Sequence, residues 1–309
     1  MKARILEILR TQGGSVSSEA LRAVLGISAV AIGEHIQSLT EAGYAIRSTS
    51  DGYRLLHSPD IPFAWEFAAR ESRIFYYPEI ASTMDVAKNL ARRGCPDFTV
   101  VIAGRQQKGR GRLNRVWLSA PGGLYFTVVL RPALPILLSP RVGFAASLTL
   151  VRVLRKMFAI PAVLKWPNDI LVDGRKVAGM LSEMEADADR VSFINIGLGI
   201  NVNNDPAASE PTAASLKQIL GRQIASVELL ARFLDDFEAR MQSAALDDVI
   251  DEWKRYTVTL KRHVRIVTHR AESEGLAVDI DANGALVLQL ADGSRKKIIY
   301  GDCFHMGQR

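Results

Sequence analysis

The sequence predicts a multidomain α+β protein with an N-terminal winged helix-turn-helix, a central mixed α/β domain and a small C-terminal β-barrel. The chain has 309 residues, which is too long for one ordinary domain. Its hydrophobic share of 48% and charged share of 23% are typical of globular proteins. The spacing of apolar residues changes twice, from helical to mixed and then to the alternation of strands. We therefore expect three domains, over residues 1–60, 63–257 and 258–309.

The first domain is predicted to contain three helices followed by a hairpin. A glycine pair ends the first helix, Ser17 and Ser18 open the second, and Ser28 caps the third. Two short helices joined by a glycine-containing turn form the helix-turn-helix pattern, and a Ser-Asp-Gly turn marks the hairpin behind it. The expected elements are helices over 2–12, 17–26 and 28–42 and strands over 44–49 and 53–56.

The central domain is expected to mix helices with apolar strands. It follows a linker, 57–62, in which two prolines disfavour regular structure. The dipeptide Asp173-Gly174 should turn a hairpin between two of its strands. The expected helices are 82–93, 226–244 and 246–256, and the expected strands are 98–103, 124–130, 162–166, 170–172, 177–184 and 192–200.

The C-terminal domain changes to a period of two residues, which is typical of strands. Turn signals at Asn283-Gly284 and Asp292-Gly293 separate its apolar runs. The simplest arrangement is a small barrel of five strands. The four runs that show the alternation are 264–268, 276–280, 285–290 and 296–300.

Composition indicates a soluble, cytoplasmic protein with no membrane partner. The longest apolar stretch, 142–151, is shorter than the roughly 20 residues that a membrane span needs. Charged residues interrupt the N-terminal apolar run at once, unlike a secretory signal. Cys95 and Cys303 are far apart and form no zinc or disulfide pattern, which fits a reducing compartment. We assign no metal ligands.

The sharpest motif is a loop of alternating glycines and arginines, Gln106–Trp117, between two predicted strands. Five cations stand within residues 105–115 with no acid among them. Arginine side chains bind carboxylates and phosphates in a bidentate manner, and glycines let the backbone approach a ligand. A solvated, flexible loop is the alternative, but the flanking strands and the terminal tryptophan favour an anion site.

Three further motifs follow the loop in the sequence. Lys165 stands within an apolar strand that Pro167 ends, so its ammonium group either reaches the surface or faces an anion in a pocket. The segment 174–183 contains a Gly-Arg-Lys turn, and the segment 196–203 contains Gly197-x-Gly199. That pair of glycines is a weak signal alone, because it lacks the third glycine of a dinucleotide fingerprint.

The four motifs in this order resemble those of biotin protein ligases. The family pattern runs GRGRxGRxW, KWPND, GRKxAGxLxE and GxGxN, and Ser82-Thr83 is similar to part of its DSTN segment. The matching stretches here are Gly109–Trp117, Lys165–Asp169, Gly174–Glu183 and Gly197–Asn201. The N-terminal and C-terminal domains are similar to those of the bifunctional ligase/repressor form. The resemblance implies a catalytic domain of the class II synthetase/biotin ligase fold and an SH3-like C-terminal barrel.

The resemblance also implies a biotin–[acetyl-CoA-carboxylase] ligase with two-step chemistry. Biotin and ATP, with Mg²⁺, would form biotinyl-5′-AMP, and a lysine of a biotin carboxyl carrier protein would then accept the biotinyl group. Two anions must be held together, so cationic side chains rather than a protein nucleophile are expected to carry the catalysis. A ligase with a winged helix-turn-helix would also be a biotin-dependent repressor of biotin synthesis genes, as a homodimer when the adenylate is bound.

Matching positions imply the site residues. The catalytic residues would be Lys165, Arg112 and Arg110. The biotin contacts would be Ser82, Thr83, Met84, Gln106, Arg110, Gly111, Arg112, Trp117, Lys165, Gly197 and Gly199. The ATP and adenylate contacts would be Arg112, Arg115, Lys165 and Asn201. Without the motif, Ser82 and Thr83 would be read as a helix N-cap and Trp117 as a core residue.

Two departures from the family pattern stand out. Asn114 replaces the third glycine of GRGRxGRxW, although asparagine tolerates a positive φ better than most residues. Met84 and Ala81 replace the asparagine and the aspartate of DSTN. Methionine can fill space against the biotin ring, but it cannot supply the hydrogen bonds of an amide.

Two other functions compete with this interpretation. A lipoate–protein ligase shares the adenylate chemistry, but the paired GRGR and KWPND motifs and the winged helix favour biotin. A regulator that only senses biotin would need no catalytic side chains, so the presence of Lys165, Arg110 and Arg112 argues for an active ligase.

The third helix has the frame of a DNA-recognition helix but unusual chemistry. Residues 28–43 contain no arginine or lysine, and residues 1–60 have no net charge. Guanine readout and phosphate attraction both normally use these cations, so we expect weak, salt-sensitive operator binding by a dimer. A purely structural winged helix is the alternative. The available contacts are Arg22, Ser28, His35, Gln37, Arg47 and Arg54.

Overall fold

The structure is a computed structural model that describes residues 1–208, 210–243, 246–269 and 271–306. The chain divides into two compact units, Met1–Ile74 and Phe75–Arg309. The first unit continues past residue 60, where the sequence placed the end of its first domain. The reason is packing, because Phe63 and Trp65 lie against the core of the N-terminal helices.

The N-terminal unit is a winged helix-turn-helix, as predicted. Ser17 and Ser28 cap their helices by accepting hydrogen bonds from backbone N–H groups, and Gly13 and Gly26 end helices in the left-handed conformation. Its elements are α1 (Lys2–Gln12), α2 (Ser18–Leu25), α3 (Ala29–Glu41), β1 (Ala45–Thr49), β2 (Gly52–His57) and the 3₁₀ turns Ala64–Glu66 and Ala68–Arg73.

A seven-stranded sheet forms the centre of the second unit, in the order β3-β4-β5-β9-β8-β7-β6, and every pairing from β4 to β6 is antiparallel. The predicted hairpin at Asp173-Gly174 joins β7 to β8, and both residues have positive φ. The strands are β3 (Ile74–Ile80), β4 (Thr99–Gln106), β5 (Leu124–Leu130), β6 (Val163–Lys165), β7 (Asp169–Val172), β8 (Arg175–Asp187) and β9 (Arg190–Ile200).

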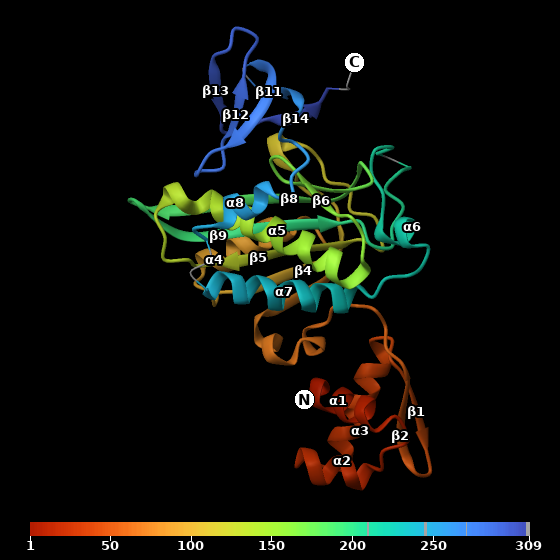
Figure 1. Cartoon of the computed structure of the whole chain (residues 1–309). Helices are drawn as coiled ribbons and strands as arrows, with labels where there is room; N and C mark the ends of the chain where they lie inside the picture. The colour runs from red at the N-terminus through yellow and green to blue at the C-terminus, as the bar shows by residue number, and fades with distance from the viewer. Residues whose placement is uncertain (209, 244–245, 270, 307–309) are drawn as a thin grey trace. The chain divides into compact units, whose positions relative to one another are not determined.

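Helices cover both faces of this sheet. On one face, α5 and α7 lie side by side (Figure 1), and the aromatic rings of Phe126, Phe233 and Phe237 pack together beneath them. On the other face, Ala87 and Ala91 of α4 pack against the strands. The helices are α4 (Thr83–Arg92), α5 (Ser139–Phe158), α6 (Leu216–Leu220), α7 (Ser226–Gln242) and α8 (Val249–Lys254).

The C-terminal module is an antiparallel sheet of five strands in the order β13-β12-β11-β10-β14. This confirms the all-β module. The strand after the last predicted run is β14, which lies beside β10 and carries residues toward the catalytic domain. The strands are β10 (His263–Val267), β11 (Glu272–Ile280), β12 (Leu286–Gln289), β13 (Arg295–Ile298) and β14 (Asp302–His305).

Several elements differ from the expectation. No element was predicted where β3, α5 and α6 lie, and the last predicted central helix, 246–256, is longer than α8. The predicted end of α7 at residue 244 lies outside the described residues. The segment Ile136–Phe158, which contains α5, is long and apolar enough to cross a membrane by composition, but 67% of its most apolar window is buried inside the protein. That burial is typical of a core helix.

Candidate active site

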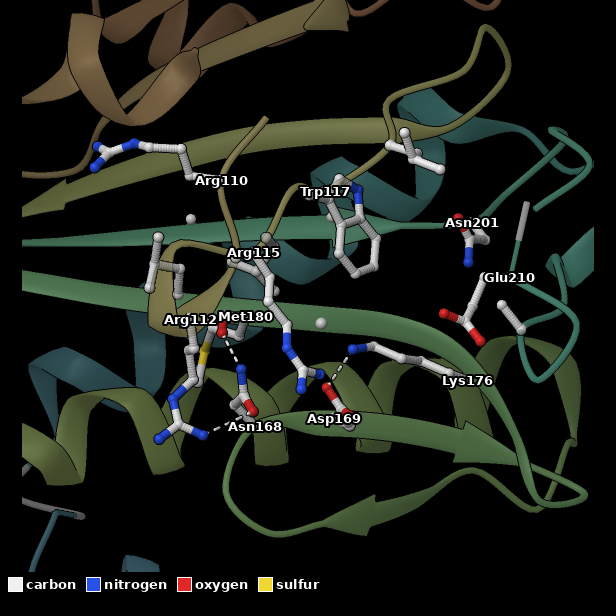
Figure 2. Close-up of a pocket in the computed structure, with 18 of the residues that line it drawn as sticks. Arg110, Arg112, Arg115, Trp117, Asn168, Asp169, Lys176, Met180, Asn201 and Glu210 are labelled. Carbon is white, nitrogen blue, oxygen red and sulfur yellow. Dashed lines mark hydrogen bonds and ion pairs between the residues drawn. The ribbon is translucent and has the colours of Figure 1, made fainter. Parts of the chain in front are cut away.

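One cavity of about 310 Å³ brings the four motifs together (Figure 2). The glycine-arginine loop, the turn after β6, the start of β8 and the end of β9 form its walls, and β14 closes one side. All but one of the residues proposed for biotin or ATP line it. These are Thr83, Met84, Gln106, Arg110, Gly111, Arg112, Arg115, Trp117, Lys165, Gly197, Gly199 and Asn201. Ser82 is buried beside the cavity and does not line it.

The glycine-arginine loop is folded back on itself as a tight hairpin. The N–H of Gly111 donates to the carbonyl of Arg115 at 2.8 Å, and the N–H of Trp117 donates to the carbonyl of Gly109 at 2.9 Å. A Cβ on Gly109 would lie 2.3 Å from that tryptophan's carbonyl oxygen, so only glycine fits. Leu113 has a positive φ of 52° within this hairpin.

Trp117 lies flat on a floor made of two glycines from neighbouring strands. Gly179 of β8 and Gly199 of β9 are paired in register. A Cβ on Gly199 would lie 2.3 Å from the indole, and one on Gly179 would lie 2.8 Å from it. The ammonium of Lys176 lies 5.3 Å from the ring centroid. The space over Gly199, which the motif position implies is a biotin contact, is therefore filled by Trp117.

Lys165 is a half-buried cation at the end of β6, facing the cavity. Within the described part of the chain it forms no ion pair, whereas Lys176 is paired with Asp169 at 2.6 Å. Cys303, buried nearby, has its pKa raised to about 12 by burial, against which the positive charge of Lys165 acts. An unpaired ammonium in a pocket is costly unless an anion binds there, which favours an anion site.

Two arginines of the loop contact the C-terminal module. Arg112 donates to the carbonyl of Gly301 at 3.2 Å, and burial lowers the pKa of its guanidinium. Arg115 is paired with the carboxylate of Asp302 on β14. The C-terminal module thus supplies carboxylate and carbonyl oxygens to the cations proposed for phosphate binding.

Arg110 is placed differently from the other two arginines. Its guanidinium forms ion pairs with Asp85 at 2.8 Å and with Glu183 at 3.0 Å. In Figure 2 it points away from Trp117 and the centre of the cavity. For the Arg110 guanidinium to contact biotin, as the motif position implies, its ion pairs with Asp85 and Glu183 would have to break.

Polar side chains cluster where α4 begins. Gln106 accepts hydrogen bonds from the backbone N–H of Thr83 at 2.8 Å and from its hydroxyl at 3.0 Å. Ser82 occupies the N-cap position of α4 but makes no capping hydrogen bond. The sulfur of Met84 fills the space over Gly197, since a Cβ there would lie 2.6 Å from it.

The opposite end of the cavity is amide-rich. Asn201 is buried, and its Oδ1 accepts a hydrogen bond from Nδ2 of Asn204 at 3.0 Å. The carboxylate of Glu210 lines the cavity near Asn201 (Figure 2). Among the described residues, no group of three or more His, Cys, Asp or Glu side chains is placed to hold a metal ion.

Sequence reasoning missed the contribution of β14. Asp302, Cys303 and Phe304 line the cavity, although they lie far from every motif in the sequence. No local signal marks them, because their role depends on how the C-terminal module packs on the catalytic domain. Lys176 and Asp169 lie inside recognised motifs, but their ion pair was not predicted, because the β7–β8 register sets Lys176 opposite Leu171 and Asp169 opposite Gly179.

His305, at the end of β14, should make stability depend on pH. Burial lowers its pKa to about 4, helped by the positive charges of Lys165 and Arg262. An exposed histidine in the unfolded chain titrates near 6.5. Between about pH 6.5 and 4, the unfolded state therefore binds a proton that the folded state does not bind. The free energy of unfolding should therefore fall as the pH drops from about 6.5 toward 4. Urea denaturation should show this slope in the wild-type protein and a shallower slope in His305→Gln; equal slopes would contradict the prediction.

The residues proposed for DNA contact are mostly on the surface of the N-terminal unit. Arg22, Arg47 and Arg54 are exposed, and Gln37 is exposed with a hydrogen bond to Glu41. His35 is half-buried. The hydroxyl of Ser28 caps α3 by accepting a hydrogen bond from the N–H of Ala31 at 3.2 Å. Ser28, proposed as a DNA contact, therefore also has a structural role.

Comparison with known proteins agrees with this site. Residues 76–201 match the Biotin/lipoate A/B protein ligase family, residues 259–306 match the biotin protein ligase C-terminal domain, and residues 2–54 match an HTH domain. The "Bifunctional ligase/repressor BirA" of Bacillus subtilis is 31% identical, with 99% of each chain covered. The "Biotin--[acetyl-CoA-carboxylase] ligase" of Paracoccus denitrificans is 32% identical, covering 61% of this chain and 83% of that one.

Solved structures agree as well. The biotin protein ligase from Aquifex aeolicus in complex with biotin and ATP superposes with a TM-score of 0.63 and 27% identity. The match covers 75% of this chain and 97% of that chain.

Proposed function

The chain belongs to the biotin protein ligase family, and from this premise we propose that the cavity activates biotin with ATP and passes the biotinyl group to a carrier protein. In the first step, a carboxylate oxygen of biotin attacks the α-phosphorus of ATP and pyrophosphate leaves. In the second, the amine of a carrier lysine attacks the acyl carbon and AMP leaves. The observation that carries the proposal is the ammonium of Lys165 at the meeting point of the four motifs, which forms no ion pair with any residue that the structure describes.

The cations would divide the work by position. Lys165 would lie between the biotin carboxylate and the α-phosphate, where negative charge must be brought together. Arg112 and Arg115 would bind phosphate oxygens in place of the oxygens of Gly301 and Asp302 that they now contact. Removing those contacts on ATP binding would couple the C-terminal module to the nucleotide. No protein nucleophile is needed, because both reacting groups belong to substrates.

Magnesium would enter with the triphosphate. Two of the carboxylates that line the cavity, Asp169 and Asp302, are paired with Lys176 and Arg115. This donor set fits a metal ion held mainly by phosphate oxygens, with a carboxylate as an occasional partner. The ion would offset the charge of the leaving pyrophosphate.

The direct test is an incubation of the protein with biotin, ATP and magnesium. We expect release of pyrophosphate and a mass corresponding to biotinyl-5′-AMP. Adding a biotin carboxyl carrier domain should give a biotinylated lysine, and lipoate should compete poorly. Efficient transfer of lipoate would favour a lipoate–protein ligase, and no adenylate from either acid would leave a biotin sensor without ligase activity.

A second function, operator binding, is favoured by the N-terminal unit. Arg47 and Arg54 face each other directly across the β1–β2 hairpin. Like charges opposite each other destabilise a strand pair unless an anion lies between them, so the wing fits a DNA phosphate. We propose that the protein represses biotin synthesis genes as a homodimer formed with the adenylate, since a dimer doubles weak contacts.

Operator binding can be tested with a gel shift on DNA upstream of biotin synthesis genes. We expect retardation with biotin and ATP present, and its loss as salt is raised, because phosphate contacts release counterions. Sedimentation under the same conditions should show the dimer. No retardation at low salt with the adenylate bound would mean that the winged helix has only a structural role.

A further inference from the structure

Another hollow of the second unit lies apart from the active-site cavity and is strongly cationic. It is a groove of about 690 Å³ between α5 and α7, the helices that lie side by side on one face of the central sheet (Figure 1). No described residue lines both the groove and the active-site cavity. Tyr256, which follows α8, closes one end. The charged residues that line the groove are Arg152, Arg155, Lys156, Arg232, Asp236 and Arg240.

Two carboxylates neutralise only part of this positive charge. Glu252 of α8 is paired with Arg152 at 2.6 Å and with Arg240 at 3.0 Å. Asp236 is paired with Arg232, one turn away on α7, at 3.0 Å. Five cations thus face two carboxylates in the described part of the groove, and the excess is positive.

Lys156 and Arg155 are the cations without a carboxylate partner in the part of the chain that the structure describes. The ammonium of Lys156 is exposed and forms no hydrogen bond or ion pair there. The guanidinium of Arg155 lies 5.3 Å from the ring centroid of Tyr256 and donates to the carbonyl of Ala162 at 3.2 Å. A hollow lined mainly by one sign of charge concentrates ions of the opposite sign. The groove is therefore suited to an anion.

The length and the chemistry of the groove point to several phosphates in a row. Its cations extend along α7 from Arg232 to Arg240, which is about 12 Å at about 1.5 Å per residue. That length exceeds a single phosphate or carboxylate. Four of the five cations are arginines, whose planar guanidinium groups bind phosphate oxygens in a bidentate manner. We infer that the groove is a second anion-binding site, which takes the phosphate chain of a small polyphosphate compound, either inorganic or carried by a nucleoside.

The groove is connected to Lys165 through β6. Arg155 donates to the carbonyl of Ala162 just before this strand begins, and the carbonyl of Tyr256 accepts from the N–H of Leu164 at 3.0 Å. Lys165 is the next residue of the strand. A phosphate that draws the guanidinium of Arg155 away from Ala162 therefore loosens the strand that positions the ammonium of Lys165. The consequence for catalysis rests on the proposed function, whereas the binding site itself does not.

The test is calorimetry on the full chain with inorganic tripolyphosphate as the titrant. We expect two binding sites, one in the active-site cavity and one in the groove. Lys156→Gln should weaken the groove site about tenfold, because a charge-assisted hydrogen bond is lost. Ala239→Glu should abolish that site, since this exposed alanine of α7 lines the groove and the new carboxylate repels phosphate. Lys165→Ala should weaken only the site in the cavity.

Matched controls place the same changes of charge elsewhere. Lys296→Gln removes an exposed lysine of β13, and Ala23→Glu adds a carboxylate at an exposed position of α2. Both controls should keep both sites. ATP bound in the groove more tightly than tripolyphosphate would identify a nucleotide as the ligand, and ATP bound no more tightly would identify an inorganic polyphosphate. Groove variants that keep both sites at wild-type affinity would overturn the inference, as would a single site in the wild-type protein that Lys165→Ala weakens.

Hydrogen exchange of the backbone over residues 159–168 measures the connection to β6. It is followed in Lys165→Ala, where the cavity site is weak, and in the same variant with Ala239→Glu added. Tripolyphosphate should speed exchange in the first and not in the second, because a loosened strand opens more often. Unchanged exchange in both would overturn the connection to Lys165. A wild-type protein that forms no biotinyl-5′-AMP would overturn the proposed function, but the calorimetric evidence for the groove would stand.

Discussion

Lys165→Ala is expected to slow adenylate formation by about 100-fold or more, with little change in the free energy of unfolding. The ammonium lies in the cavity without an ion pair among the described residues, so the fold loses no partner when it is removed. Catalysis does lose a positive charge, because a carboxylate and a phosphate must approach each other against their own repulsion. In a site with little water, one positive charge between them has a large effect on the barrier.

The measurement is pyrophosphate release with biotin and ATP, together with urea denaturation. Lys296→Ala is a matched control, since Lys296 is an exposed lysine on β13 outside the cavity. The control should keep wild-type turnover. Near-normal turnover in Lys165→Ala would remove this residue from the mechanism, and a large loss of stability would show that its role is structural.

Local signals were enough to predict the N-terminal unit. Serines before α2 and α3 cap them, and glycines after α1 and α2 end them, because each effect depends only on residues within one turn. The same holds for the hairpin at Asp173-Gly174, where positive φ angles require a particular turn chemistry. These are short-range constraints that the sequence states directly.

The meeting of the motifs also follows from simple geometry. The β8–β9 hairpin pairs Gly179 with Gly199, which puts the third and fourth motifs side by side. The β7–β8 pairing sets Asp169 opposite Gly179, which adds the second motif. Once the strands are correctly identified, antiparallel neighbours bring these residues to one place on the sheet.

What could not be predicted depends on tertiary packing. Helix α5 is buried on most sides, so its apolar residues show no single stripe and the helical period is weak. The contact of Arg112 with Gly301 joins residues 189 positions apart. Likewise, motif position implied that Gly197 and Gly199 contact biotin, and only the structure shows that Met84 and Trp117 lie over these glycines.

The packing of Trp117 leads to the second large effect, for Gly199→Ala. We expect kcat/KM for biotin to fall about 100-fold while the fold remains stable. The new methyl group would lie 2.3 Å from Cε2 and 2.4 Å from Nε1 of the indole. The strand cannot move away, since β9 is held between β5 and β8, so the indole must leave the floor. Gly199 does not have the positive φ that would strain an alanine, and the stability cost is therefore small.

Displacing Trp117 should also disturb the glycine-arginine loop, because the backbone N–H of Trp117 donates the hydrogen bond to the carbonyl of Gly109 that closes this loop. Tryptophan fluorescence should shift toward the red as the indole meets water, and pyrophosphate release should report the loss of kcat/KM. Gly143→Ala is the matched control in the same unit, because its methyl group would make an ordinary contact of 3.4 Å with Met180. Wild-type kcat/KM in Gly199→Ala would contradict the assignment, since the indole could then leave its glycine floor without consequence for the substrate.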